Sequence, residues 1–151
     1  GPGIDINGFS ADEKICFTDG LRDSLQLLLA ESGEQAAMFC AENLNYPFEL
    51  VWPVIEAFGL SVTLDVGHLE YYGFPTGLYL ERYLYKAKVL HMHGTKEGRD
   101  HNSLAFMKPE ALDLVMTFLS EIPDESRVFT MEIFSQNDFD SSCNVMQRFL
   151  P

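Results

Sequence analysis

The stretch Leu60-Ser61-Val62-Thr63-Leu64-Asp65-Val66-Gly67-His68 decides the fold. It opens with a short apolar run, Leu60–Leu64, of a length typical of a buried strand, and a carboxylate follows directly at Asp65. An amphipathic pattern over Leu50–Phe58 precedes it and is closed by Gly59, the residue type expected just beyond a helix end. The sequence therefore predicts a helix, a buried strand and a polar strand end in succession.

The same cycle recurs on both sides of this stretch. Helices are predicted over Leu21–Leu29, Thr76–Lys86, Ala111–Leu119 and Phe139–Leu150. Further strands are predicted at Ala36–Ala41, which we expect to be buried on both faces, at Val89–Leu90 and at Val128–Met131. Alternation of strands and helices is typical of the α/β class, with a parallel sheet and right-handed crossovers.

Each predicted strand ends at a polar residue, and these residues are Glu42, Asp65, His91 and Glu132. They are spaced by about one β/α unit, except that a polar loop lengthens the last interval. The carboxyl ends of parallel strands lie at one rim, where β/α proteins gather their catalytic residues. The sequence therefore predicts that three carboxylates and an imidazole converge at this rim.

Such a cluster favours a bound cation. Carboxylates packed together repel one another, and at least one would stay protonated without a cation among them. Oxygen ligands combined with imidazoles suit Zn²⁺, Mn²⁺ or Fe²⁺, and we expect one to three divalent ions. A single Asp or Glu after a strand is more often a helix cap. However, all the histidines of the chain, His68, His91, His93 and His101, fall in these strand-end and loop motifs.

The ordered motifs Ala41–Leu44, Leu64–His68, His91–Gly94, Arg99–His101 and Met131–Ile133 resemble the xylose-isomerase-like TIM barrels. That superfamily includes sugar and sugar-phosphate isomerases and epimerases and the endonuclease-IV-type AP endonucleases. The resemblance covers residues 20–150 and implies the C-terminal half of a barrel, about four β/α units, because a complete barrel needs about 250 residues. Residues 1–151 then form a single partial domain. Residues 1–20 lead into it, and residues 1–3 fit the remnant of an expression tag.

The resemblance also implies roles for particular residues. The implied metal ligands are Glu42, Asp65, His68, His91, Asp100, His101 and Glu132. The implied catalytic groups are Glu42, Glu132 and His68. In the related endonucleases one residue separates the late Asp and His, whereas Asp100 and His101 are adjacent here, so His101 is the stronger candidate ligand.

Other polar residues near these motifs have two interpretations each. His93 is either itself a metal ligand or a residue that supports a metal ligand or a substrate oxygen. Lys96 and Arg99 are the bases near the site and either bind an anionic substrate group or are solvated loop charges. Asn43 either orients Glu42 or caps the next helix.

The run HMHGTKEGRDHNSL, residues 91–104, looks most like the cobamide-remodelling phosphodiesterases, which hydrolyse the nucleotide loop of a cobamide. The leading expectation is therefore a divalent-metal-dependent phosphodiesterase acting on a small phosphorylated substrate. One alternative is a metal-dependent sugar or sugar-phosphate isomerase or epimerase, with Glu42 and Glu132 as opposed acid/base groups. A second alternative is a non-catalytic half-barrel that binds a metal or a partner.

Composition restricts the partners. The net charge of −13, from 23 acidic and 10 basic residues, opposes binding to a DNA backbone. No apolar stretch approaches the ~20 residues that span a bilayer, so no membrane segment is expected. Cys16, Cys40 and Cys143 are far apart and are expected to be reduced thiols in the cytoplasm. An isolated half-barrel leaves two sheet edges open, which favours self-association or pairing with an N-terminal half-barrel.

Overall fold

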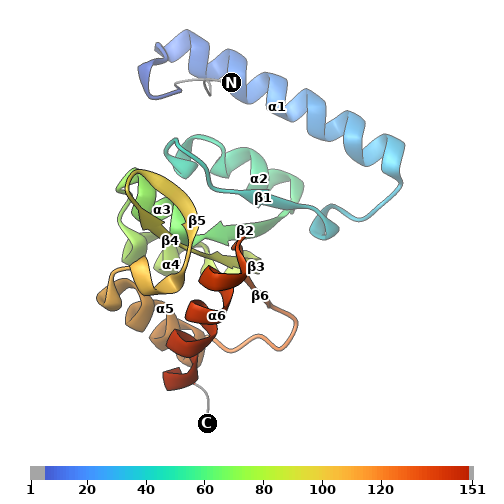
Figure 1. Ribbon diagram of the computed structural model, residues 1–151. Coiled ribbons are helices and arrows are strands. Elements are labelled where there is room, and N and C mark those ends of the chain that lie inside the picture. Colours follow the sequence, from blue (N-terminus) through green and yellow to red (C-terminus); the bar gives the residue numbers. More distant parts are fainter. Residues whose placement is uncertain (1–5, 150–151) are drawn as a thin grey trace.

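The computed structural model describes residues 6–149 (Figure 1). The helices are α1 (Ala11–Ser32), α2 (Trp52–Phe58), α3 (Val66–Tyr72), α4 (Thr76–Tyr83), α5 (Pro109–Glu121) and α6 (Gln136–Met146). The strands are β1 (Cys40–Glu42), β2 (Ser61–Asp65), β3 (Ala87–Met92), β4 (Gly94–Lys96), β5 (Arg99–Asn102) and β6 (Val128–Met131). Short 3₁₀ turns occupy Ile6–Gly8, Ala36–Met38, Phe48–Leu50, Leu84–Lys86, Leu104–Phe106 and Gln147–Phe149.

The main sheet is parallel throughout and has the order β1-β2-β3-β6. Its register places Glu42 opposite Thr63, Asp65 opposite His91, and His91 opposite Thr130. The predicted α/β class with a parallel sheet is therefore confirmed. Because the strands are parallel and in register, their carboxyl ends lie at one edge.

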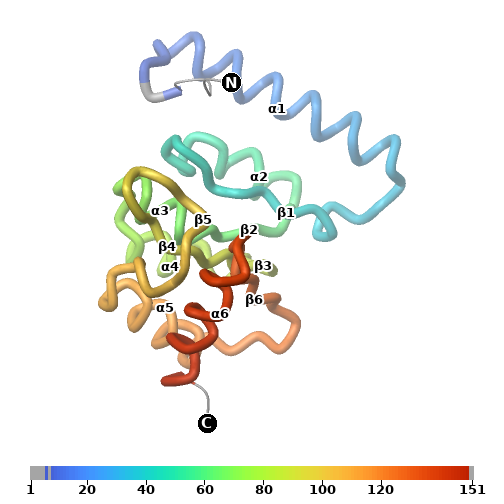
Figure 2. Tube along the Cα trace, viewed as in Figure 1, coloured from blue at the N-terminus to red at the C-terminus, as the bar shows by residue number. Residues whose placement is uncertain are grey.

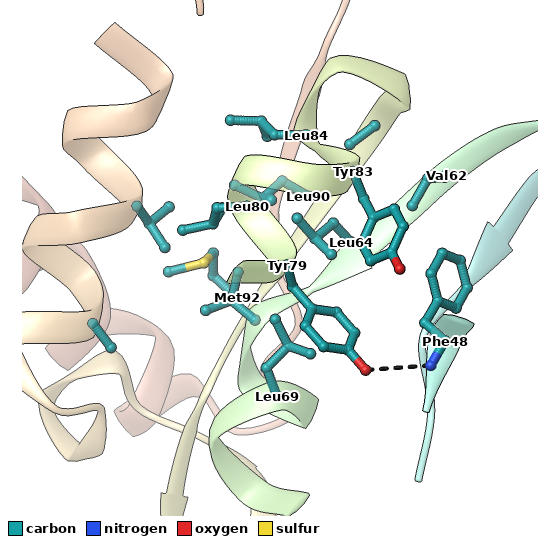
Figure 3. Packing of buried hydrophobic residues seen from close by; sticks show 14 of the residues in the cluster. Phe48, Val62, Leu64, Leu69, Tyr79, Leu80, Tyr83, Leu84, Leu90 and Met92 are labelled. Carbon is teal, nitrogen blue, oxygen red and sulfur yellow. Dashed lines mark hydrogen bonds between the residues drawn. The ribbon is translucent and has the colours of Figure 1, made fainter. Parts of the chain in front are cut away.

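The core lies between one face of the sheet and the helices that cover it. Figure 3 shows Tyr79, Leu80 and Tyr83 of α4 against strand residues, among them Leu64 and Leu90. Leu64, Leu80 and Leu90 have no exposed surface. Burying a leucine side chain contributes about 1.5–3 kcal/mol, so this interface holds the strands rigidly beneath the site.

Except at β2, which is buried at every position, the opposite face of the sheet is less covered. Successive side chains of a strand point to opposite faces, so Thr63, His91 and Thr130 turn away from the helix-covered core. On the outer strand β6, Val128 is 55% exposed. Within residues 6–149, β1 and β6 each have a neighbouring strand on one side only.

The expectation that Ala36–Ala41 is a strand buried on both faces is wrong. Ala36–Met38 forms a 3₁₀ turn, the strand begins only at Cys40, and Met38 is 72% exposed. The apolar composition of this run indicated a central strand. β1 is instead an edge strand, where no neighbour covers its outer side.

Two stretches outside the predicted helices and strands are ordered elements. After Asp65 the chain turns directly into α3, because the Asp65 side chain accepts a hydrogen bond from the His68 backbone N–H and caps the helix. After β3 the chain forms the antiparallel hairpin β4–β5. Its two-residue turn, Glu97-Gly98, has positive φ at both positions (53° and 72°), as in the tight turns that suit the twist of a hairpin.

The N-terminal helix α1 starts with a capping box, in which Ser10 and Glu13 satisfy each other's backbone N–H groups, and ends at Gly33. It packs on α2, and α1 and α6 lie at opposite ends of the molecule (Figures 1 and 2).

No helix within residues 6–149 is both long enough and apolar enough to cross a membrane. The cysteines at 16, 40 and 143 are free thiols. The possible tag remnant at residues 1–3 and the expected last helical residue, Leu150, lie outside the described residues.

Candidate metal centre

The four parallel strands bring Glu42, Asp65, His91 and Glu132 together, and their ligand atoms all lie within 4.8 Å of one another. His91 Nδ1 is at the middle of this group. It lies 3.1 Å from Glu132 Oε2, 3.3 Å from Glu42 Oε1 and 3.8 Å from Asp65 Oδ2. Metal–ligand bonds of about 2.0–2.2 Å place opposite ligands of one ion roughly 4.4 Å apart. We call these four residues the strand-end group. Their spacing fits a single ion.

Three buried atoms of the strand-end group lack a hydrogen-bond partner among residues 6–149. They are Asp65 Oδ2, His91 Nδ1 and Glu132 Oε2. Leaving a buried polar atom unpaired costs about 1–3 kcal/mol, and such atoms are rare in folded proteins. Three of them facing one point are readily explained by a cation that all three would ligate.

A second group lies beside the first and consists of His68, His93 and His101, whose ligand atoms also lie within 4.8 Å of one another. We call it the histidine group. Glu132 connects the two groups, because its Oε2 atom lies 3.1 Å from His91 Nδ1 and 3.6 Å from His101 Nε2. The arrangement therefore offers positions for two neighbouring ions.

Asp65 is held at both its backbone and its side chain. Asn43 Oδ1 accepts from the Asp65 N–H at 2.8 Å, and Asn43 Nδ2 donates to the Asp65 carbonyl at 2.9 Å. The Asn43 side chain thus continues the β1–β2 ladder beyond the last backbone pair, a role that differs from both predicted ones. Asp65 Oδ1 accepts from the His68 N–H at 2.8 Å, and the other carboxylate oxygen, Oδ2, is left for the strand-end group.

His68 lies in the first turn of α3 and, as a member of the histidine group, also lies beside the strand-end group. Its Nδ1 atom lies 3.2 Å from Asp65 Oδ2, 3.3 Å from the Asn43 carbonyl and 3.8 Å from Glu42 Oε1. Three acceptors around Nδ1 favour a proton on that nitrogen, which leaves Nε2 as the atom that could bind a metal. The Tyr72 ring lies against the His68 ring, with centroids 5.8 Å apart.

The hairpin supplies His101 in an unusual backbone conformation. Its φ of 58° lies in the left-handed region, which is sparsely populated by non-glycine residues and concentrated at functional sites. Asp100 Oδ1 lies 2.9 Å from His101 Nδ1, so the opposite nitrogen faces Glu132. The structure places Asp100 outside both ligand groups, where it orients His101.

Three further residues surround the site. Lys96 and Arg99 are exposed on the hairpin, and the Lys96 ammonium lies 4.6 Å from the centroid of the Phe106 ring. Phe134 is 78% exposed and lies against the His101 ring, with centroids 4.9 Å apart. The sequence gives no sign of the role of Phe134, since nothing in it indicates that the chain returns to His101 after Glu132.

The electrostatics of the carboxylates differ. Burial, reinforced by the charge of Asp65, raises the pKa of Glu42. Burial also opposes ionisation of Asp65, but contacts with the His93 side chain and the His68 backbone N–H outweigh it and lower the pKa of Asp65. Asp65 therefore stays ionised, and the crowding of negative charge disfavours the ionised form of Glu42 instead.

Scans against protein-family models and searches of curated proteins and solved structures found no match. Function is therefore argued from the geometry of the site. Carboxylate and imidazole donors in two adjoining groups can hold divalent ions, polarise a bound oxygen and move protons through the glutamates.

Proposed function

We propose that this chain carries the metal centre of a divalent-metal-dependent phosphodiesterase. The observation that carries the proposal is the junction of two ligand groups at Glu132, with unpaired buried atoms within the strand-end group. Paired ions of Zn²⁺, Mn²⁺ or Fe²⁺ supply Lewis acidity at a phosphoryl group and lower the pKa of water.

The proposed ligands would hold two ions. Glu42, Asp65 and His91 would hold one ion, and His68 and His101 a second. Glu132 would contact both, because its Oε2 atom faces His91 and His101 together. Lys96 and Arg99, on the hairpin that carries His101, would bind an anionic oxygen of the substrate.

The proposal includes the complete fold, a β/α barrel, and the substrate, a cobamide. A parallel sheet with one less covered face and two open edges is consistent with the C-terminal half of a β/α barrel, completed by a second copy or an N-terminal half. The resemblance of residues 91–104 to cobamide-remodelling phosphodiesterases supports a cobamide nucleotide loop as the phosphodiester.

A sugar or sugar-phosphate isomerase is the second candidate, and one observation favours it. Glu42 is the last residue of β1 and Glu132 directly follows β6, and these are the outermost strands, so the two carboxylates flank His91 from opposite sides. Two such groups around a single ion could move a proton between neighbouring carbons of a sugar.

Metal content and activity test these proposals together. Metal would be measured by plasma mass spectrometry on the wild type, on Glu132→Gln, and on Glu125→Gln as a control that removes an exposed charge far from both groups. We expect metal in the wild type and the control, at least a ten-fold loss in Glu132→Gln, and hydrolysis of bis-p-nitrophenyl phosphate with Mn²⁺ or Zn²⁺.

Other outcomes select among the alternatives. Epimer or aldose–ketose interconversion without phosphodiester hydrolysis would favour the isomerase. Bound metal with neither activity, even with an N-terminal half-barrel supplied, would favour a non-catalytic metal-binding module. A wild type that takes up no Mn²⁺ or Zn²⁺ would overturn both enzymatic proposals for this chain.

A further inference from the structure

His93 lies behind the metal centre and has no exposed surface. One ring nitrogen, Nδ1, lies 3.1 Å from the backbone nitrogen of His101 and accepts its hydrogen. The Gly94 carbonyl is further from Nδ1, at 3.4 Å. Because a backbone N–H can only donate, Nδ1 is unprotonated, and the neutral ring carries its proton on Nε2.

The protonated nitrogen faces a metal ligand. His93 Nε2 lies 3.2 Å from Asp65 Oδ1, although the pair does not meet hydrogen-bond geometry. Asp65 Oδ1 already accepts from the His68 N–H, so the His68 backbone nitrogen and His93 Nε2 both lie beside this one oxygen. The other oxygen, Oδ2, faces His91 and His68 and has no hydrogen-bond partner.

The surrounding backbone fixes the His93 ring in this position. A Cβ at Gly67 would lie 2.3 Å from His93 ring atoms, so only glycine leaves room for the ring beside α3. A Cβ at Gly94 would lie 2.0 Å from the Ser103 carbonyl, so the chain just after His93 is enclosed as well. The His101 ring stacks on the His93 ring, with centroids 4.5 Å apart and planes 29° apart.

We propose that His93 is a positioning residue that links the β4–β5 hairpin to the metal centre. The His101 backbone sets the tautomer of His93, His93 directs its Nε2–H at Asp65 Oδ1, and Asp65 thereby presents Oδ2 to the ion. His93 itself is neither a ligand nor in contact with substrate. This inference rests on the proposed metal site, and it predicts that the hairpin and the metal affinity are coupled through a single buried ring.

Two substitutions separate the positioning role from simple packing. His93→Leu fills the space without a donor, whereas His93→Gln keeps an N–H donor that reaches the same oxygen. Tyr79→Phe serves as a control, because it removes a buried hydroxyl that accepts from the Phe48 N–H, away from both ligand groups. Zn²⁺ affinity would be measured by chelator competition and folding by circular dichroism for all four proteins, including the wild type.

We expect His93→Leu to weaken Zn²⁺ binding by about ten- to hundred-fold, as other losses of ligand-supporting groups do. His93→Gln should retain most of the wild-type affinity, and Tyr79→Phe should lose stability without a change in affinity. Wild-type affinity in folded His93→Leu would overturn the proposal. Equal loss of an ion in both His93 variants would also overturn it, because His93 would then be a direct ligand.

Nitrogen NMR of the metal-free wild type provides a test that needs no variant. We expect His93 to be the Nε2–H tautomer with its Nδ1 hydrogen-bonded, and the Nδ1–H tautomer would contradict the proposal. If the wild type binds no metal, the proposed function fails. The tautomer measured by NMR then still decides whether His93 supports Asp65.

Discussion

Asp65 contacts the end of β1, the start of α3 and the other members of the strand-end group. Its backbone binds the Asn43 side chain at the end of β1, one carboxylate oxygen caps α3, and the other faces the strand-end group. A substitution at Asp65 would therefore disturb helix capping and metal binding together. Glu42 is a cleaner probe, because it makes no capping contact and its charge is the disfavoured one.

Replacing Glu42 should stabilise the metal-free chain at neutral pH. The pKa of Glu42 is raised, so the folded state disfavours the ionised carboxylate. This cost is absent below about pH 4, where the group is protonated in folded and unfolded chains alike, and is complete above the raised pKa. Glu42→Gln in chelator should therefore melt at a higher temperature than the wild type at pH 7, and the gain should vanish toward pH 4.

Glu125→Gln provides the comparison for this measurement, since it makes the same change in net charge at an exposed position. An equal gain in both variants would mean that relief of the −13 net charge, rather than the crowding around Glu42, causes the effect. Metal should reverse the order, because the wild type alone keeps its full set of carboxylate ligands.

At the scale of elements, two glycines in helices should respond in opposite ways to alanine. Gly20 lies inside α1, and nothing lies within 4 Å of the position that an added Cβ would take, so Gly20→Ala should stabilise the chain by about 0.5–1 kcal/mol. Gly67→Ala drives a methyl group into the His93 ring and should cost about 1–3 kcal/mol. Urea unfolding measures both. A neutral Gly67→Ala would show that α3 can move away from His93.

Elements with an apolar pattern and clear end signals could be predicted from the sequence, whereas the others depended on tertiary contacts. Periodicity located β2, α5 and β6, because each combines an apolar pattern with clear end signals. α3 is only seven residues long and forms because Asp65 caps it, which apolar spacing does not reveal. The hairpin β4–β5 consists mostly of polar residues, and its pairing depends on the positive φ of Glu97 and Gly98.

The candidate site could likewise be predicted only in part. The strand-end rule placed Glu42, Asp65, His91 and Glu132 together, and the structure brings all of them to one point. The supporting contacts were not predictable in this way. The double hydrogen bond from Asn43 to Asp65 and the His101 N–H bond to His93 both depend on the register of neighbouring elements.

At the scale of the whole molecule, the open sheet predicts association. In the part of the chain that the structure describes, the outer edges of β1 and β6 are unpaired, which favours pairing with another chain, but the net charge of −13 opposes a second copy. Salt screens that repulsion, so the mass from size exclusion with light scattering should exceed 17.1 kDa and rise with ionic strength. A strict monomer at high concentration and high salt would count against closure by self-association. The association to measure would then be binding of this chain to an N-terminal half-barrel.

Every strand of the main sheet contributes one residue to the strand-end group, from Glu42 at the end of β1 to Glu132 just after β6. An ion held there would act as a cross-link between the first and the last strand, each of which pairs with one neighbouring strand within residues 6–149. Opening either edge would then require release of the ion. Its binding energy would add to the stability of the sheet as a whole, and amide exchange at both edges would slow together.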